Sequence, residues 1–365
     1  MPPDSSIEPG PAATPAALGY RMPAEWEPHA ATWLSWPHTP ETWPGQFEPI
    51  PAIWTELVAA LSLVEPVHVL AGEGAVFEQA NSLLAGFLNR SGAAGSPRHP
   101  VHLHPIATND AWTRDHGPIF LVGPAGSPPV LVDWDYNAWG GKYPPYDLDQ
   151  QVPRLVAEML GYRRYEPGIV LEGGAIDVNG RGALLTTEQC LLNPNRNPHL
   201  GRRQVERYLA DYLAARHVIW LGRGIAGDDT DGHIDELARF VGPRTVVAAV
   251  EEDPADENYR PLRDNFERLQ MATDEQGRSL ELVSMPMPRP VYYGDRRLPA
   301  SYMNFYIANG LVIAPAFGDP ADTTVQEALA RLLPGRRVIG MRAVELAWGL
   351  GAFHCITQQQ PVVPN

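Results

Sequence analysis

Short runs of apolar residues recur along the whole chain, and stretches with a different hydrophobic spacing separate them. The runs are rich in Val, Ile and Trp, which is typical of buried strands, and they begin near residues 31, 67, 118, 130, 217, 245 and 311. Apolar residues at helical spacing lie between some of them, at 53, 57, 61 and 64 and again at 205, 208, 209, 212 and 213. Strands therefore alternate with helices, which predicts an α/β fold, and this periodicity alone fits a layered parallel sheet.

The organisation of the chain is predicted to be simple. Its first nineteen residues are rich in Pro and Ala and have neither a basic start nor an apolar centre, so we expect a disordered tail over 1–19 rather than a signal peptide. No linker or shift in composition follows, and residues 20–365 are predicted to form one domain. The 38 prolines and 33 glycines of the sequence fit short elements joined by shaped loops that carry a site.

Charge and cysteine content limit the partners and the location. The net charge of -15 argues against a nucleic-acid partner and favours a cationic ligand. The two cysteines, Cys190 and Cys355, do not resemble a disulfide framework or a four-ligand zinc site, so we expect a reducing compartment, the cytoplasm. Because no apolar run approaches roughly 18 residues, we expect no membrane-spanning segment.

Three polar segments combine residue types that suit a small planar cation. In NDAWTRDHGP, Trp112 offers an aromatic face close to the carboxylate of Asp115. In DDTDGHIDE, His233 and Asp235 are two residues apart, which places both side chains on one face of a strand. In LEGGAIDVNG, Glu172 precedes a Gly-Gly pair, where the backbone can approach a ligand closely. The alternative for each segment is a structural ion pair or a solvated carboxylate.

One further motif resembles a nucleotide-binding site. Gly222, Gly224 and Gly227 have the GxGxxG spacing of a dinucleotide site and follow an apparent strand. Acidic residues such as Asp228 and Asp229 come directly afterwards and would repel a pyrophosphate, so nucleotide binding is not expected.

The stretch GLGAFHCITQQQP places Cys355 between a histidine and a run of glutamines. A thiol becomes a nucleophile when positive charge or a histidine lies nearby, whereas many free cysteines are simply buried. Successive side chains of an extended segment point to opposite faces, so His233 is a better candidate for the acid or base than the adjacent His354. Cys190 lies in an apolar stretch and is expected to be structural.

Taken in order, these segments resemble the agmatine deiminase family, within the guanidine-modifying superfamily that also includes peptidylarginine deiminases. The resemblance covers nearly the whole chain and rests on eight motifs in sequence. They are MPAEWEPHAATWLSWPH, NDAWTRDHGP, DWDYNAWGGKY, LEGGAIDVNGRG, TEQCLLNPNRNP, DDTDGHIDE, SYMNFYIANG and HCITQQQP. The resemblance implies a five-bladed α/β propeller of ββαβ units with the site on its central axis, no cofactor or metal, and a homodimer or higher assembly.

The resemblance also implies a set of site residues. They are the nucleophile Cys355, the acid/base and binding pair His233 and Asp235, the carboxylates of Asp115 and Glu172, and the substrate-binding Trp112 and Asn304. Cys355 would attack the carbon of a guanidinium held by Asp115 and Asp235. His233 would protonate the departing ammonia and then activate the water that hydrolyses the thiouronium. The implied reaction converts agmatine to N-carbamoylputrescine and ammonia.

Three alternatives remain open at this point. A peptidylarginine or free-arginine deiminase would use the same chemistry with a cation at the pocket mouth, for which Arg114 and Lys142 are the candidates. A binding protein for guanidinium groups would need the acidic residues and Trp112 alone. A metal-dependent hydrolase would gather Asp229, Asp231, His233 and Asp235 around one ion.

Overall fold

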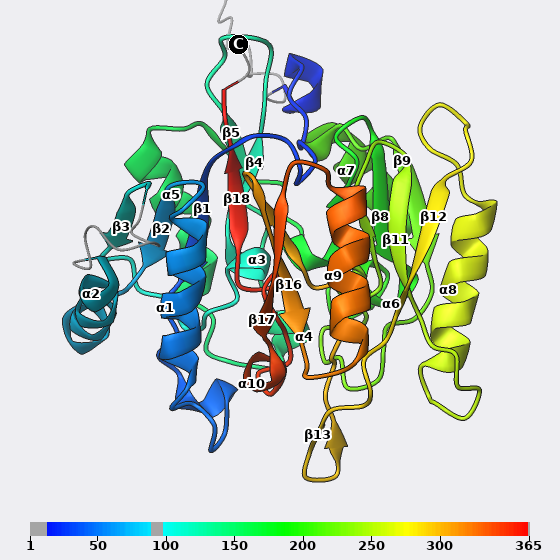
Figure 1. Cartoon of the computed structure of the whole chain (residues 1–365). Helices are drawn as coiled ribbons and strands as arrows, with labels where there is room; N and C mark the ends of the chain where they lie inside the picture. Colours follow the sequence, from blue (N-terminus) through cyan, green and yellow to red (C-terminus); the bar gives the residue numbers. More distant parts are fainter. Residues whose placement is uncertain (1–12, 89–97, 364–365) are drawn as a thin grey trace, which may run out of the picture.

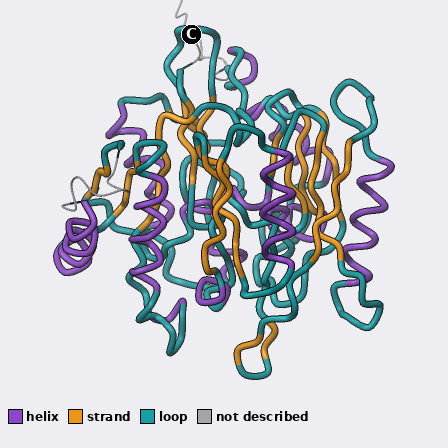
Figure 2. Tube along the Cα trace, in the orientation of Figure 1, coloured by secondary structure: helices purple, strands orange, loops and turns teal. Residues whose placement is uncertain are grey.

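Several small sheets form the core of the molecule. The computed structural model describes residues 13–88 and 98–363. Five of the sheets contain three or four strands and share one arrangement, in which a strand pairs antiparallel with one neighbour and, after a helix, parallel with the next. Helices α1, α2, α8 and α9 lie on the outside and the strands further in (Figures 1 and 2). The predicted α/β class is confirmed, but the described residues form separate sheets instead of one layered parallel sheet.

The strands and longer helices have the following bounds. The first sheet has β18 (Gln358–Pro361), β1 (His29–Ser35), β2 (Val67–Leu70) and β3 (Val101–His104), with α1 (Ile50–Leu61) and α2 (Gly74–Leu88). The second and third have β4 (Ile119–Leu121), β5 (Val130–Val132), α5 (Val152–Leu160) and β6 (Arg164–Tyr165), then β7 (Asp177–Val178), β8 (Ala183–Thr187), α7 (Arg202–Leu213) and β9 (His217–Leu221). The fourth and fifth have β10 (Ala238–Phe240), β11 (Thr245–Val250), α8 (Tyr259–Met271) and β12 (Glu281–Pro286), then β15 (Tyr306–Ala308), β16 (Leu311–Ala316), α9 (Ala321–Leu332) and β17 (Arg337–Arg342).

Shorter elements connect these units. They are η1 (Ala16–Leu18), η2 (Pro40–Thr42), α3 (Thr113–His116), α4 (Ala138–Gly141), η3 (Asp149–Gln151), η4 (Gly173–Ala175), α6 (Glu188–Leu191), η5 (Ile234–Glu236), α10 (Val344–Ala347) and the hairpin of β13 (Tyr292–Tyr293) and β14 (Arg296–Arg297). No helix in the described part of the chain is long and apolar enough to cross a lipid bilayer.

The hydrophobic pattern explains why these elements form. All seven apolar runs are found as strands, namely β1, β2, β4, β5, β9, β11 and β16. Nearly every residue of β1, β4, β5 and β16 is buried, which is why β4, β5 and β16 are apolar throughout rather than alternating. Both predicted helical patterns are also found, as α1 and α7, and α7 buries Val205, Leu209 and Leu213 on one face. These strand and helix predictions are confirmed.

The two ends of the chain meet in the first sheet, where the glutamine run forms β18 beside β1. The glutamine side chains are buried, so their amides need partners inside the protein. Gln360 accepts a hydrogen bond from Trp33 Nε1 at 2.9 Å, and Gln358 donates to the carbonyl of Pro118 at 2.8 Å. These contacts fix the strand that directly follows Cys355.

The tail predicted over 1–19 falls mostly outside the described residues, which begin at 13. Its last residues include η1, which is followed by Gly19 in the left-handed region, with a φ of 83°. The helix packs against α7, so this part of the segment has a defined place. The boundary of the domain stays a prediction.

Three histidines stack on the surface of the first sheet. His68 and His104 lie on neighbouring strands with nitrogen atoms 2.7 Å apart, and the ring of Trp33 stacks on His68 with centroids 4.3 Å apart. Burial and the nearby His104 and His102 lower the pKa of His68 to about 3. The neutral imidazole is therefore the form that the folded chain favours.

We expect this cluster to make the fold sensitive to acid. A depressed pKa stabilises the folded state fully above the unfolded pKa near 6.5, and that contribution is lost as the pH falls from there toward 3. His68→Gln should therefore reduce the drop in unfolding free energy between pH 7.5 and pH 5 by roughly 1–2 kcal/mol. Urea denaturation at both pH values measures this, with the exposed His199→Gln as control. Equal pH dependence in the His68 variant and the unmodified chain would contradict the expectation.

Candidate active site

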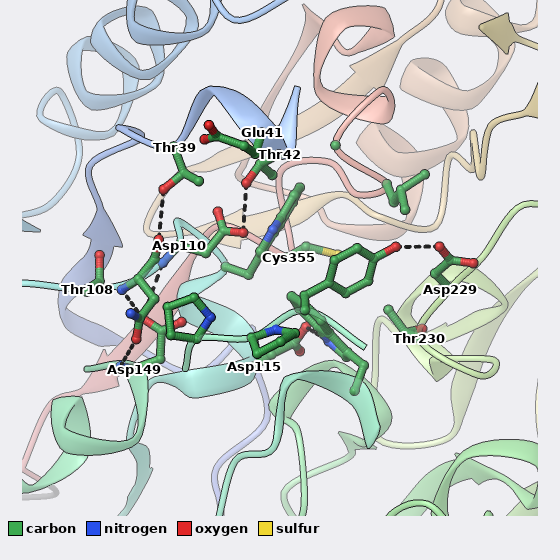
Figure 3. A pocket seen from close by; sticks show the side chains of 18 of the residues that line it. Thr39, Glu41, Thr42, Thr108, Asp110, Asp115, Asp149, Asp229, Thr230 and Cys355 are labelled. Atoms are coloured by element: carbon green, nitrogen blue, oxygen red, sulfur yellow. Dashed lines mark hydrogen bonds between the residues drawn. The ribbon is translucent and has the colours of Figure 1, made fainter. Parts of the chain in front are cut away.

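A cavity of about 600 Å³ reaches Cys355 and is the candidate active site (Figure 3). Trp112 and Asp115 line it together with Cys355. Its other walls carry the aromatic residues Tyr136, Trp139, Tyr143 and Trp348 and the acidic residues Glu41, Asp110, Asp149 and Asp229. Aromatic faces combined with carboxylates suit a small organic cation.

Asn304 fixes the loop that carries the nucleophile candidate. Its Oδ1 atom accepts hydrogen bonds from the backbone N–H groups of Ala352, His354 and Cys355 at 3.0–3.2 Å. Its Nδ2 atom donates to Cys355 Sγ at 3.0 Å. Asn304 is fully buried, and its Nδ2 atom also donates to Glu236 Oε1 at 2.8 Å, so one amide contacts the loop, the sulfur and a buried carboxyl group.

The surroundings of Cys355 hold its thiol in the neutral form. Burial raises the pKa of the thiol well above its usual value, and the carboxylates of Asp235, Glu236 and Asp115 raise it further. The hydrogen bond from Asn304 acts in the opposite direction. Cys355 Sγ lies 3.5 Å from Asp235 Oδ2 and 4.0 Å from Glu236 Oε1, so two carboxylates adjoin the sulfur directly.

Asp115 is held in place by the neighbouring backbone and an indole. Its Oδ2 atom accepts a hydrogen bond from Trp139 Nε1 at 2.9 Å, and its Oδ1 atom accepts one from the N–H of Gly174 at 3.0 Å. Trp139 adopts a left-handed φ of 56°, a costly conformation for a bulky residue that is typical of functional sites. Burial raises the pKa of Asp115.

Gly174 shows how closely three acid/base groups converge. A Cβ atom at this position would lie 2.6 Å from His233 Nδ1, 2.7 Å from Asp115 Oδ1 and 3.2 Å from Asp235 Oδ2. Such distances leave no space for a side chain, so only glycine fits. The Gly-Gly pair was expected to allow a close approach to a ligand, and here it allows a close approach to the site residues themselves.

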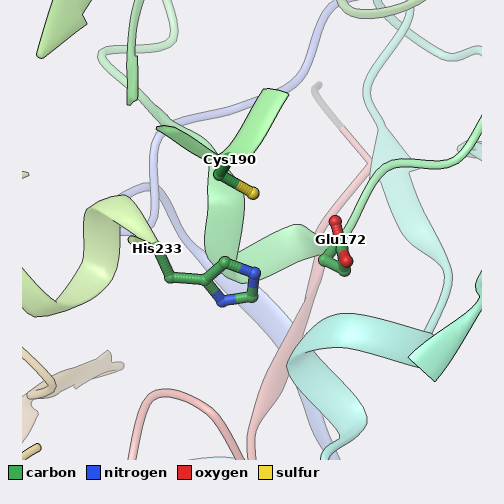
Figure 4. Close-up of side chains that lie close together, drawn as sticks. All are labelled: Glu172, Cys190 and His233. Carbon is green, nitrogen blue, oxygen red and sulfur yellow. The ribbon is translucent and has the colours of Figure 1, made fainter. Parts of the chain in front are cut away.

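His233 lies between two further buried groups (Figure 4). One ring nitrogen, the Cys190 sulfur and a carboxylate oxygen of Glu172 lie within 4.8 Å of one another. Burial alone would lower the pKa of His233, but Asp115, Cys190 and Glu172 together raise it well above its usual value. Neither ring nitrogen has a hydrogen-bond partner of good geometry within residues 13–88 and 98–363. His233 is buried and is not among the residues that line the cavity, and its raised pKa favours the imidazolium form.

Glu172 is paired with a neighbouring guanidinium. Arg196 Nε donates to Glu172 Oε1 at 2.5 Å, and both side chains are fully buried. Arg196 also binds Asp231 at 2.6 Å. The second oxygen of Glu172 has no partner in the described part of the chain. Cys190, expected to be a buried structural residue, is buried as expected but also contacts the site through His233.

The structure thus brings the sequence-predicted residues to one place. Asp115, His233 and Asp235 surround Gly174, Glu172 adjoins His233, and Trp112 lines the cavity beside Cys355. Asn304 contacts the sulfur of Cys355 and, like His233, Asp235 and Glu172, is not among the residues that line the cavity. Its role in substrate binding stays a prediction.

Sequence reasoning missed several participants. The expectation that His354 and Cys355 face opposite ways assumes an extended segment, but residues 353–356 form a turn. His354 Nδ1 and Cys355 Sγ both adjoin Asp235 Oδ2, at 2.7 and 3.5 Å. Glu25 lies in the motif MPAEWEP, without any local signal for a role in the site. Trp139 was visible within NAWGGKY, but the contact of its indole with Asp115 depends on a strained turn that no spacing rule foretells.

The two candidate cations for binding a substrate carboxylate, Arg114 and Lys142, are both paired within the protein. Arg114 is buried and directs its guanidinium to Glu25 and Gln359, so it is not at the cavity mouth. Lys142 is bound by the carbonyl of Asp229 and the carboxylate of Asp231.

The metal and nucleotide readings also disagree with the geometry. Asp229 binds Tyr143 and Arg296, whereas Asp231 binds Lys142 and Arg196, so these two carboxylates do not converge with His233 and Asp235 on one point. The three glycines of the GxGxxG spacing are followed by turns and then by η5. A dinucleotide site instead needs a helix that begins directly after the glycines.

Comparisons with known proteins agree with this site. The family model of the Porphyromonas-type peptidyl-arginine deiminase matches residues 21–361. The agmatine deiminases of Pseudomonas aeruginosa (strain LESB58) and Ectopseudomonas mendocina (strain ymp) are 40% and 39% identical to this chain, over 96% and 95% of its length and 98% and 97% of theirs. The structure of the agmatine deiminase of Enterococcus faecalis superposes with a TM-score of 0.88 at 34% identity, covering 96% of this chain and 98% of that one.

These matches extend over nearly the whole chain, and their sequence identities of 34–40% are higher than a shared fold alone would require. The resemblance carried by the eight sequence motifs is confirmed. The chain belongs to the family of Porphyromonas-type peptidyl-arginine deiminases and agmatine deiminases.

Proposed function

We propose that this chain hydrolyses the guanidinium group of agmatine, releasing ammonia and N-carbamoylputrescine. The observation that carries the proposal is the buried thiol of Cys355 at the end of a cavity, with the carboxylates of Asp115 and Asp235 and the imidazole of His233 around it. Membership of a deiminase family with agmatine deiminases at about 40% identity supports the same reaction.

The carboxylates suit a guanidinium in number and placement. A guanidinium is planar and offers five N–H donors, which carboxylates accept in pairs. Within the described chain, Asp235 Oδ1 and Glu172 Oε2 are buried and lack a hydrogen-bond partner. Each such atom costs about 1–3 kcal/mol, and a bound guanidinium would relieve that cost. Trp112 would pack along the aliphatic part of the substrate.

The protonation states suggest an order of events. Before binding, His233 is protonated and the thiol of Cys355 is neutral, because both pKa values are raised. A bound guanidinium cation would offset the carboxylates and lower the pKa of the thiol. The thiol would then lose its proton to water in the cavity, while Asp235, which adjoins the sulfur at 3.5 Å, stays ionised.

The chemical steps then follow from these positions. The sulfur of Cys355 bonds to the guanidinium carbon, and His233 donates a proton to the departing nitrogen, which leaves as ammonia. The resulting thiouronium remains attached to Cys355. His233, now neutral, accepts a proton from water as the water attacks the same carbon. The carbon–sulfur bond breaks, and the ureido product leaves.

The far end of the cavity favours agmatine over arginine. Agmatine ends in an ammonium, whereas arginine and a peptide with C-terminal arginine end in a carboxylate. Among the described lining residues, Arg296 is the one Lys or Arg side chain, and Asp229 binds it at 2.6 Å. The other charged groups there include Glu41, Asp110 and Asp149. Burial raises the pKa of Asp110 to about 6 and that of Asp149 to about 7, so an ammonium would stabilise their ionised forms.

We also infer that the five sheets are the blades of a propeller around the site, with residues 20–365 as a single domain. The shared strand order of the five sheets supports this arrangement. Assembly as a homodimer rests on the resemblance to the family. A cytoplasmic location is supported by two buried cysteines that are not in a disulfide.

Replacing the nucleophile should abolish the reaction. Cys355→Ser should lower ammonia release from agmatine by about 10⁴-fold or more, because a hydroxyl is a far weaker nucleophile in this setting. Acid quenching of the unmodified chain during turnover should trap an adduct, and peptide mapping should place it on Cys355 and not on Cys190. Added chelator should have no effect on the rate. Turnover by a folded Cys355→Ser variant would contradict the mechanism.

The thiol pKa gives a prediction that needs no substrate. Alkylation of Cys355 by iodoacetamide should keep accelerating above pH 9, because burial and the neighbouring carboxylates raise its pKa. Asp235→Asn removes one of these negative charges and should move the alkylation midpoint to lower pH. Mass spectrometry of the labelled peptide measures both rates. A midpoint near 8.5 in the unmodified chain would be inconsistent with this environment.

A further inference from the structure

We infer that His354, clamped between Asp235 and Glu25, is a positioning residue that keeps Asp235 ionised and turns its second oxygen toward the guanidinium of the substrate. The inference rests on the proposed deiminase function and adds two residues to it. Neither residue lines the cavity, so both would act through Asp235.

The first argument is the geometry of the imidazole. His354 Nδ1 lies 2.7 Å from Asp235 Oδ2, and His354 Nε2 lies 2.8 Å from Glu25 Oε2. A carboxylate oxygen at each ring nitrogen requires a hydrogen on both nitrogens, so the ring is an imidazolium. The side chain is buried, which removes competing contacts with water.

The backbone around the ring is equally fixed. The N–H of His354 donates to Asn304 Oδ1 at 3.0 Å, and its carbonyl accepts from Arg114 Nε at 3.3 Å. Asn304 also holds Cys355, so one amide sets the positions of the nucleophile and of the histidine together. The ring therefore has little freedom to move away from Asp235.

The second argument is the charge behind the ring. Glu25 Oε2 also lies 2.9 Å from Arg239 and 3.3 Å from Arg114, and Glu25 Oε1 accepts from the N–H of Ile307 at 2.8 Å. Burial alone would raise the pKa of Glu25, but Arg239 and His354 lower it far below its usual value. Glu25 thus stays ionised and does not take the proton from His354.

The third argument concerns the effect of His354, held between Asp235 and Glu25, on the two neighbouring carboxyl groups. Asp235 and Glu236 are adjacent and buried, and like charges so close would not both persist. His354 binds Asp235, and the pKa of Asp235 is lowered against the effect of burial. Burial raises the pKa of Glu236 well above its usual value, and the charge of Asp235 adds to this effect. His354, through its hydrogen bond and its charge, is the largest contributor that keeps the charge on Asp235, and His233 and Arg239 add to its effect.

The same contact sets the direction of Asp235. Its Oδ2 atom is taken by the imidazolium and adjoins the sulfur of Cys355. Its Oδ1 atom is buried and has no partner among residues 13–88 and 98–363. An ionised oxygen without a partner beside the nucleophile is the acceptor that a guanidinium N–H requires.

The test compares variants of His354 and measures kcat/KM for agmatine from pH 5 to pH 10. His354→Phe keeps an aromatic ring but removes both donors. As a result kcat/KM should fall at least 100-fold, and the acid limb of its pH profile should move up by at least one pH unit. His354→Asn retains a donor near the position of Nδ1 and should recover about tenfold of the loss. Glu25→Gln weakens the other end of the clamp and should move the acid limb in the same direction by a smaller amount.

A matched control separates this role from a structural one. His217 also uses a ring nitrogen to bind the protein, with Nε2 2.7 Å from the carbonyl oxygen of Thr273. His217→Asn should lower thermal stability and leave the acid limb in place. An acid limb that is unchanged in folded His354→Asn and Glu25→Gln would overturn the inference while the proposed function stands. An unmodified chain that releases no ammonia from agmatine would overturn both.

Discussion

Five carboxyl side chains are buried around one thiol in this molecule, and each must either lose its charge or adjoin a cation, because an unpaired buried ion costs several kcal/mol. They are Asp115, Glu172, Asp235, Glu236 and Glu25. Glu172 adjoins Arg196, and Glu25 adjoins Arg239 and Arg114. The remaining three carboxyl groups have two histidines as nearby cations. A bound guanidinium would supply the positive charge that this cluster lacks.

This need for compensating charge connects the fold to the chemistry. Arg239 comes from β10, Glu25 precedes β1, and His354 precedes β18, so the ion network joins segments from both ends of the chain and its middle. Asn304 adds the loop before β15. The buried glutamines of β18 then anchor the nucleophile loop against β1. Packing and hydrogen bonding of the sheets therefore place the site atoms, and the short loops between strands supply them.

The sequence predicted the elements well and their arrangement poorly. Periodicity identified seven strands and two helices because it reports which faces are buried. Periodicity carries no information on which strands pair, so it did not predict the division into small sheets, which the family resemblance implied as ββαβ units. The motifs identified the site residues because Cys355, His233 and Asp115 occur within short sequences that are typical of the family. Glu25 and His354 were missed because their roles depend on partners hundreds of residues away, which no local pattern records.

The measurement that tests the account most directly is a side-by-side determination of kcat/KM for agmatine, free arginine and a peptide ending in arginine. A cavity whose lining is acidic, and whose Arg296 is already paired with Asp229, should reject a carboxylate. We expect agmatine to be preferred by at least 100-fold over both arginine substrates, with ammonia and N-carbamoylputrescine formed in equal amounts. Equal or greater activity on either arginine substrate would contradict the assignment of the cavity to a dication.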